Sequence, residues 1–183
     1  MKYKTKLSRW LRDLFPASIE VSLRERWRVA MAAGLSLAVI ALYWRLLGWA
    51  IDWDGHRLGL LAPLGASALL VFAVPASPMA QPWPAVMGNT LSVAAGLLAA
   101  HGLPIPELAI GLALPASIMI MYASRSLHPP GVAMALLMVL SGPDSDPASM
   151  LVCGFLGSLL LVLLGCVLNP VTGKQYPVRM PVR

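Results

Sequence analysis

Apolar residues in this chain gather into six segments, separated by short stretches rich in proline, glycine or charge. Five of the segments run for about 17 residues or more, which suits helices that cross the roughly 30 Å hydrocarbon core of a bilayer. The segment at residues 131–140, the fifth along the chain, is shorter, and a helix of about ten residues reaches only about half of that thickness. We therefore predict an all-α membrane protein with about six transmembrane segments, at residues 28–50, 58–74, 84–100, 106–122, 131–140 and 148–168.

The composition supports the membrane class. Of the 183 residues, 58% are hydrophobic and 12% charged, and a mean hydropathy of +0.73 leaves too few polar residues for a soluble surface. The length accommodates one six-span domain and no second soluble domain.

Cys153 and Cys166 share one apolar segment without metal-site or redox spacing, so they are interpreted as core residues. The first apolar run is too long for a secretory signal and is expected to be retained.

Charged residues predict the orientation. Eight of the fourteen Lys and Arg residues, from Lys2 to Arg28, lie before or at the start of the first apolar run, and such a flank marks a cytoplasmic, lipid-facing segment, not a nucleic-acid-binding one. Acidic residues follow segments one, three and five, whereas basic residues follow segments four and six. Both termini are therefore expected in the cytoplasm, with the protein in a bacterial inner membrane. Four crossings with two re-entrant segments would give the same sidedness, so charge alone leaves both topologies open.

The N-terminal residues 1–24 are expected at the cytoplasmic face as a basic segment. Both an interfacial amphipathic piece around residues 10–15 and a disordered tail fit this composition. Ser22 and Glu25 have the spacing of a capping box, which predicts a helix start. Residues 25–170 then form the transmembrane domain, and residues 171–183 form a cytoplasmic tail.

Two stretches rich in proline, glycine and small residues resemble each other. Pro63–Leu70 aligns with Pro129–Leu136 at an offset of 66 residues, and small residues of the third segment match residues of the sixth at the same offset. Each unit of three segments crosses an odd number of times, so the second unit is expected upside down relative to the first, as an inverted repeat. Segments two and five are then short or half-helices whose N-termini both point into the membrane and converge near its midplane.

Converging helix starts predict an anion site. A helix N-terminus presents free N–H groups and about half a positive charge, so two of them together favour a bound anion. Backbone that is not helical at membrane depth also requires a covering of protein or water, which suggests a polar pathway. The predicted substrate-binding residues are those of the two helix starts and the polar residues near them: Gly65, Ala66, Ser67, Asn89, Arg125, Ser126, His128, Pro129, Pro130, Gly131 and Val132.

Four separated motifs, taken together and in order, resemble the HPP family of integral membrane proteins. They are Pro63–Ala68, Val74–Pro82, Leu127–Gly131 and Asn169–Pro177, and the resemblance covers roughly residues 25–178. Family members in cyanobacteria and chloroplasts are linked to nitrite transport, so the resemblance implies nitrite as the substrate. Some bacterial members continue into cytoplasmic CBS domains, whereas this chain ends at Arg183, so none is expected here. The run Gly131–Met134 is bulkier than the family's usual small-residue run.

We therefore expect a channel or permease for a small monovalent anion, with nitrite as the first candidate. His128 would supply a donor or a proton, and Arg125 would attract anions at the inner mouth. No cofactor, no metal and no enzymatic activity are expected, because three histidines and eight acids form no set of nucleophile, base and orienting group. The anion and the lipid bilayer are the expected partners, and a homo-oligomer is compatible with the sequence.

Two alternatives remain open at this stage. The first is a copper-handling membrane protein, because thioethers are ligands for copper(I) and four methionines lie near the His-Pro-Pro motif. The second is a noncatalytic scaffold subunit of a larger membrane complex. The four methionines are Met119, Met121, Met134 and Met138.

Overall fold

A computed structural model describes residues 21–51, 59–142 and 146–179, and all regular structure within these ranges is helical. Each of the six predicted segments is present as a helix, which confirms the all-α membrane fold. The N-terminal amphipathic piece and the acids at positions 52, 54 and 144 lie outside the described residues. The elements are α2 (Leu23–Ile51), α3 (Leu61–Ala73), the 3₁₀ helix η2 (Pro78–Ala80), α4 (Pro82–Gly102), α5 (Pro106–Ala123), α6 (Pro129–Ser141) and α7 (Pro147–Val171).

Helix length divides the six into two groups. The stretch Leu23–Leu46 of α2, together with α4, α5 and α7, is long and apolar enough to cross a membrane. Helices α3 and α6 have 13 residues each, about 20 Å of helix, which is shorter than a hydrocarbon core. Short helices at the second and fifth places were predicted, and this is confirmed. The inverted relation of the two three-helix units stays a prediction.

The starts of the two short helices differ from each other. Helix α6 begins at Pro129, as its sequence predicts. Helix α3 begins at Leu61, so Pro63 is its third residue and not its opening one. Proline is tolerated there because the amides of the first turn have no partner inside the helix.

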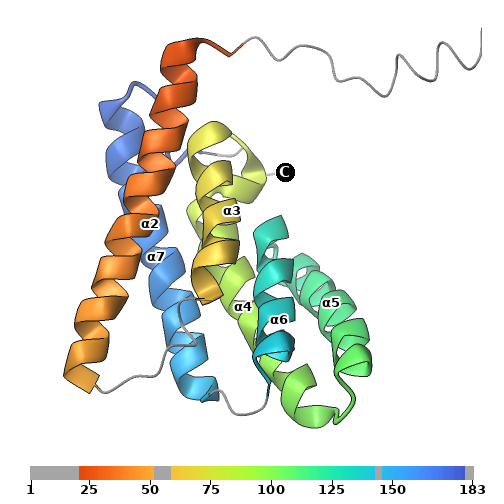
Figure 1. Ribbon diagram of the computed structural model, residues 1–183. Helices are drawn as coiled ribbons and strands as arrows, with labels where there is room; N and C mark the ends of the chain where they lie inside the picture. Colours follow the sequence, from red (N-terminus) through yellow and green to blue (C-terminus); the bar gives the residue numbers. More distant parts are fainter. Residues whose placement is uncertain (1–20, 52–58, 143–145, 180–183) are drawn as a thin grey trace, which may run out of the picture.

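Consecutive helices run in opposite directions along the bundle (Figure 1). The start of α2 and the end of α7 consequently lie at the same end, which we call the terminus end. The connections from α3 to α4 and from α5 to α6 also lie there, whereas α4 is joined to α5 at the opposite end. Arg125 is therefore at the terminus end and Glu107 at the opposite one.

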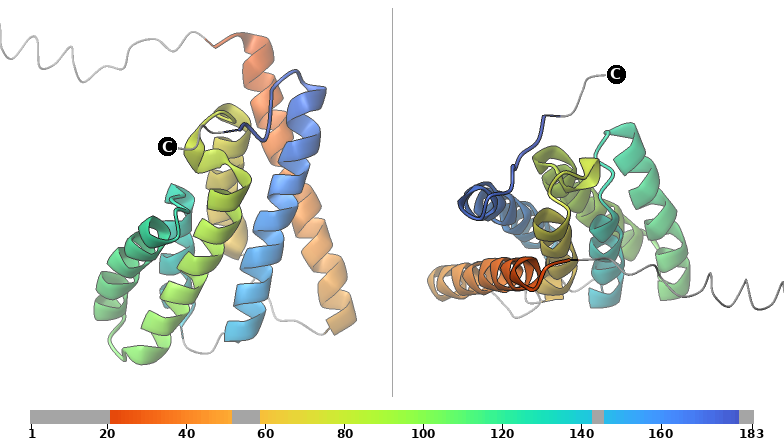
Figure 2. Two further views of the ribbon diagram at one scale, coloured as in Figure 1. Left: turned by 180° about the vertical axis from the view of Figure 1, so that it is seen from behind. Right: turned by 90° about the horizontal axis from the view of Figure 1, so that it is seen from above.

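Helix α4 lies in the middle of the bundle and contacts α5, α6 and α7. Seen from above, α2 and α7 lie on one side and α5 on the other (Figure 2). Gly88, Ser92 and Gly96 recur at every fourth position of α4, a spacing of small residues that lets membrane helices approach closely. A Cβ added to Gly96 would lie 2.8 Å from the Cα of Ala135, so α4 and α6 meet backbone to backbone.

The predicted capping box is half formed. The Oγ of Ser22 accepts a hydrogen bond from the backbone N–H of Glu25 at 3.2 Å, and α2 begins at Leu23. The Glu25 carboxylate turns instead to Arg28, at 2.8 Å from two of its guanidinium nitrogens. The helix therefore starts before the first predicted span, and Arg28 is incorporated into the folded domain.

Candidate functional site

His128 is fully buried at the start of α6 and connects three elements. Its Nδ1 lies 2.7 Å from the carbonyl oxygen of Met79 in η2, and its Nε2 lies 2.9 Å from Oγ of Ser67 in α3. Because a carbonyl oxygen can only accept, Nδ1 must carry a hydrogen. In the neutral ring, Nε2 carries no hydrogen and therefore accepts a hydrogen bond from the Ser67 hydroxyl.

Asn89 of α4 extends this chain of hydrogen bonds into the bundle. Its Nδ2 donates to Oγ of Ser67 at 3.1 Å and to Oγ of Ser158 in α7 at 3.0 Å. Ser92 lies on α4 one turn further along, and its Oγ would be 2.8 Å from a Cβ added to Gly131. All of these side chains are fully buried. We call Ser67, Asn89, Ser92, His128 and Ser158 the polar cluster.

Two polar atoms of the polar cluster, one amide oxygen and one hydroxyl, have no hydrogen-bond partner. They are Oδ1 of Asn89 and Oγ of Ser92, and the indole Nε1 of buried Trp44 is also unpaired. A buried polar atom left unpaired costs about 1–3 kcal/mol, and such atoms are uncommon in native proteins. Of the two atoms, the Ser92 hydroxyl can donate a hydrogen bond to a ligand, whereas Oδ1 of Asn89 requires a donor.

No acidic side chain of the described residues contacts the polar cluster. Glu25 is paired with Arg28 and Lys174, and Glu107 is exposed in the first turn of α5. Asp146 is exposed at the start of α7, where hydrogen bonds from Ser149 lower the pKa of its carboxyl. The polar cluster therefore combines neutral hydrogen-bond donors with a histidine and has no negative charge beside it.

Arg125 occupies the turn that leads from α5 to His128. Its backbone φ is +53°, in the left-handed region that glycine usually fills at this position of a helix end. The N–H of Arg125 bonds the carbonyl of Tyr122 at 3.2 Å, and the N–H of Ser126 bonds that of Met121 at 2.8 Å, which is a Schellman motif. The exposed Arg125 side chain is thus held at the terminus end, three residues from His128.

The expected convergence of two helix N-termini is wrong. The start of α6 lies beside the second turn of α3, through the bond from Ser67 to His128. The start of α3 lies beside the third turn of α6, where a Cβ added to Gly59 would be 3.3 Å from the side chain of Leu137. Antiparallel helices that pack along their lengths place their starts at opposite ends of the contact, so the two do not meet.

Backbone donors are also scarce at the start of α6. The first two residues, Pro129 and Pro130, have no N–H, and the N–H of Gly131 donates to the carbonyl of His128 at 2.8 Å. The first three residues therefore offer no free amide. Side chains, not backbone, supply the donors that the structure brings together here.

The other predicted site residues are distributed around the polar cluster. Ser126 is buried, and its hydroxyl lies 2.6 Å from that of Ser124. Gly131 packs on Gly88, whose carbonyl oxygen would be 2.8 Å from an added Cβ. Ser67, Asn89 and His128 belong to the polar cluster, Pro130 is buried, Gly65 and Val132 are partly buried, and Ala66, Arg125 and Pro129 are exposed.

Sequence reasoning missed Ser92 and Ser158 as candidate site residues. Ser158 lies in α7 and accepts a hydrogen bond from Asn89. The signal was present in the repeat offset of 66 residues, which pairs these two serines with each other. Gly154, one turn before Ser158 in α7, lies against Val93 of α4.

The proline-rich loop before α4 is held by Gln81 and by the C-terminal tail. Nε2 of Gln81 donates to the carbonyls of Pro75 and Ser77 at 2.8 and 2.9 Å, and its Oε1 accepts from the N–H of Val178 at 2.8 Å. The buried Tyr176 hydroxyl donates to the carbonyl of Ala80 at 2.8 Å, and burial raises the pKa of this phenol. These bonds fix the loop whose Met79 carbonyl holds His128.

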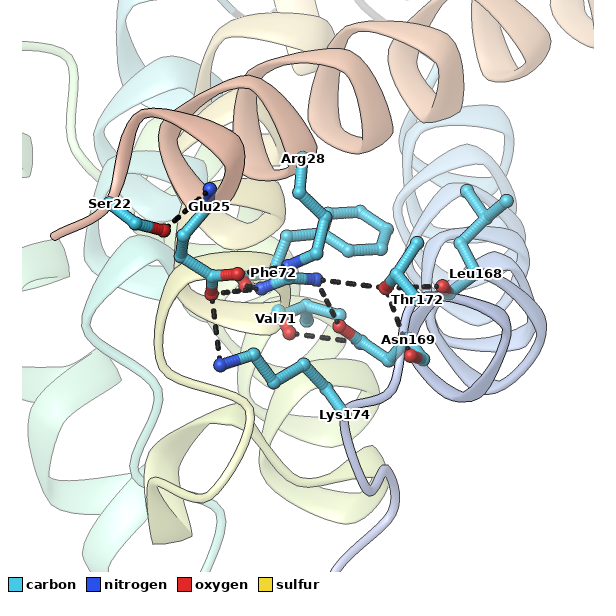
Figure 3. Close-up of polar contacts among 9 residues, drawn as sticks. All are labelled: Ser22, Glu25, Arg28, Val71, Phe72, Leu168, Asn169, Thr172 and Lys174. Atoms are coloured by element: carbon cyan, nitrogen blue, oxygen red, sulfur yellow. Dashed lines mark hydrogen bonds and ion pairs between the residues drawn. The ribbon is translucent and has the colours of Figure 1, made fainter.

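Arg28 caps the end of α3, the helix that carries Ser67 (Figure 3). Its guanidinium donates to the carbonyl of Phe72 at 2.6 Å and to Oδ1 of Asn169 at 3.1 Å. Asn169 in turn donates to the carbonyl of Val71 at 3.1 Å. The last carbonyls of a helix lack partners and carry a partial negative charge, so a buried cation and an amide both stabilise them.

The same network ties the C-terminal tail to α2. Nζ of Lys174 lies 3.1 Å from Oε1 of Glu25, and the Glu25 carboxylate also holds Arg28 (Figure 3). Arg28 makes a further bond to the hydroxyl of Thr172 at 3.3 Å. The network therefore joins α2, α3, α7 and the tail, and it fixes α3 one turn beyond Ser67.

The methionines near the site have structural contacts. Sδ of Met121 accepts the backbone N–H of His128 at 3.5 Å, and Met134 and Met138 are buried in the core between helices. In the part of the chain that the structure describes, no group of three or more His, Cys, Asp or Glu residues is placed to hold a metal ion.

Comparison with known proteins gives two kinds of match. A family model described as the HPP transmembrane region matches residues 18–177. A transmembrane protein of Dictyostelium discoideum is 36% identical over 131 residues, which cover 68% of this chain and 46% of that protein. A second transmembrane protein of the same organism is 32% identical over 151 residues, with coverages of 79% and 49%. The chain thus spans about half the length of these relatives. No solved structure matches it.

Proposed function

The chain belongs to the family of integral membrane proteins defined by the HPP transmembrane region, and we propose that it is a channel or permease for a small monovalent anion, with nitrite as the first candidate. The anion binds among the side-chain donors of the polar cluster, in place of the bonds that these groups make to one another. No chemical conversion accompanies its passage.

One observation carries this proposal: the polar cluster is buried in the membrane domain, combines hydrogen-bond donors with an unpaired Ser92 hydroxyl, and is contacted by no carboxylate of the described residues. Polar groups inside a membrane domain are costly and usually mark a substrate path. Hydroxyls, an amide and an imidazole donate hydrogen bonds to an anion, whereas a cation site would use oxygen ligands with negative charge. The cluster therefore suits a small anion better than a cation.

The charge distribution supports entry from the terminus end. Arg24, Arg26 and Arg125 are exposed there, while Glu107 and Asp146 are exposed at the opposite end. We propose that the terminus end faces the cytoplasm of a bacterial inner membrane, because basic residues concentrate on the cytoplasmic side of membrane proteins. Arg125 then raises the local anion concentration next to His128.

The direct test is anion flux in proteoliposomes. Purified full-length protein is reconstituted, and nitrite, nitrate and formate uptake are compared with those of protein-free vesicles. The proposal expects nitrite uptake well above the protein-free level. Uptake of all three anions equal to that of protein-free vesicles would make anion transport wrong and would favour a scaffold role.

Asn89→Asp is expected to reduce nitrite flux at least tenfold. The substitution keeps the size of the side chain but places a carboxylate among the donors, and two like charges 4 Å apart repel by about 4 kcal/mol at an effective dielectric constant of about 20. Flux is measured in the same vesicles after size-exclusion chromatography shows a folded protein. Asn89→Ser is the neutral control and should retain more flux than the aspartate variant. Equal flux in the aspartate variant and the wild type would exclude Asn89 from the path.

Arg125→Gly removes the positive charge of this residue but keeps its left-handed backbone conformation. Glycine fits the left-handed conformation better, so the free energy of unfolding should stay the same or rise by about 0.5–1 kcal/mol. Loss of the positive charge should lower nitrite uptake roughly twofold to tenfold at low salt, and less at 0.15 M salt because of screening. Uptake is compared at both ionic strengths, with Arg125→Lys as the charge-preserving control. A uniform loss of flux at both salt concentrations would contradict an electrostatic role.

A further inference from the structure

The hydrogen bonds of His128 are arranged so that either protonation state is satisfied. In the neutral ring, Nδ1–H donates to the Met79 carbonyl and Nε2 accepts from the Ser67 hydroxyl. Ser67 has only one hydroxyl hydrogen, which is then used on His128, and its oxygen accepts from Nδ2 of Asn89. The direction of every bond in this chain is therefore determined by the Met79 carbonyl.

A proton added to Nε2 reverses one bond and leaves the others intact. The Nε2–H group would donate to Oγ of Ser67, and the Ser67 hydrogen would turn to the carbonyl of Pro63, which already lies 3.2 Å from Oγ. Oγ of Ser67 would then accept from both His128 and Asn89. The only movement needed is rotation of a hydroxyl, so protonation does not require any buried group to lose its partner.

Within the residues that the structure describes, no acidic side chain lies beside His128 to balance the charge of such an imidazolium. The elements packed against His128 are α3, η2, α4 and α5, through Ser67, Met79, Gly88 and Met121. Within them and α6, the titratable side chains are His101 and Glu107, both at the far end of the bundle, and the exposed Tyr122. The adjacent turn adds exposed Arg125, which is itself positive.

A buried cation without a partner is strongly unfavourable, and so is a buried anion without one. The two together form a neutral pair, with the anion satisfied by the donors of the polar cluster. On the premise of the proposed anion transport, we infer that His128 takes up one proton on Nε2 with each anion bound, so that transport is electroneutral anion–proton symport. The proton is taken from water on one side and released to water on the other, with no bond of the anion formed or broken.

The deciding measurement is the stoichiometry and voltage dependence of nitrite flux in wild-type proteoliposomes. Uptake is recorded together with internal pH from a trapped dye, and the membrane potential is set with potassium and valinomycin. Protein-free vesicles give the background from undissociated nitrous acid. We expect one proton per nitrite and a rate that does not change with the imposed potential. Protein-dependent nitrite flux that follows the potential and moves no proton would overturn symport but leave anion transport intact, whereas no flux above background would remove the premise.

His128→Gln tests whether the proton is carried by this residue. Glutamine keeps a polar side chain but cannot be protonated, so proton-coupled nitrite flux should fall at least tenfold. His101→Gln is the matched control, since His101 is exposed at the far end of α4, and it should retain wild-type coupling. Coupled flux at the wild-type level in the His128→Gln variant would overturn the assignment to His128.

Discussion

Gly96→Val is expected to destabilise the contact between α4 and α6 strongly. Gly96 of α4 faces α6 so closely that an added Cβ would lie against the carbonyl oxygen of Ala135, 2.8 Å from its Cα and 2.9 Å from its carbonyl carbon. All three are backbone atoms, which cannot rotate away as a side chain can. The two helices must separate, and overpacking of this kind costs typically 1–3 kcal/mol and occasionally more.

Separation of α4 and α6 would also loosen the polar cluster, because Asn89 and His128 lie on these two helices. We expect the apparent melting temperature in detergent to fall by about 5–10 °C and folded yield to drop. Gly111→Val is the matched control: Gly111 is exposed in α5, and a Cβ added there meets nothing within 4 Å. If the Gly96→Val protein melts at the same temperature as the Gly111→Val protein, α4 and α6 do not meet backbone to backbone.

Arg28→Met is the second substitution with a large expected effect. It removes the guanidinium that bonds the carbonyl of Phe72, the side-chain oxygen of Asn169 and the Glu25 carboxylate. The side chain of Arg28 is only 7% exposed, so water replaces few of these bonds. Removing one partner of a buried ion pair typically costs 3–5 kcal/mol, and because the Glu25 side chain is 24% exposed we expect about 2–4 kcal/mol.

The structure also predicts which helix loses stability in the Arg28→Met variant. Helix α3 should exchange its last amide hydrogens faster, which hydrogen–deuterium exchange in detergent measures directly. Arg24→Met is the control, since it removes the same charge one turn earlier at an exposed position. If both variants unfold at the same temperature as the wild type, the Arg28 network contributes no stability to the fold.

Helix positions were predictable because local patterns in the sequence determine them. Apolar runs separated by proline, glycine and charge indicated all six helices, and the Ser22–Glu25 spacing indicated the start of α2. The prediction that α3 opens at Pro63 was wrong for a local reason as well. Proline is allowed at any place in the first turn of a helix, so its presence does not identify the first residue.

The candidate site was predictable only in part. His128, Ser67 and Asn89 were selected from the sequence and do lie together. Ser158 and the Met79 carbonyl were not selected, because their contacts join residues 69 and 49 positions apart. Arg28 was interpreted as part of a cytoplasmic flank, since a basic residue before an apolar run has that role in most membrane proteins.

The sequence by itself determined that this is a helical membrane protein, how many segments it has, which two are short, and which family it belongs to. Hydropathy and helix length decide these properties because each segment must satisfy its own backbone hydrogen bonds in lipid. Only the tertiary structure decided that the two short helices pack antiparallel with their starts apart, and that the start of α6 is bonded through the His128 side chain and offers no free amide in its first three residues. Those outcomes depend on which helix faces which, and α4 sets them by bringing Gly88, Ser92 and Gly96 against α6.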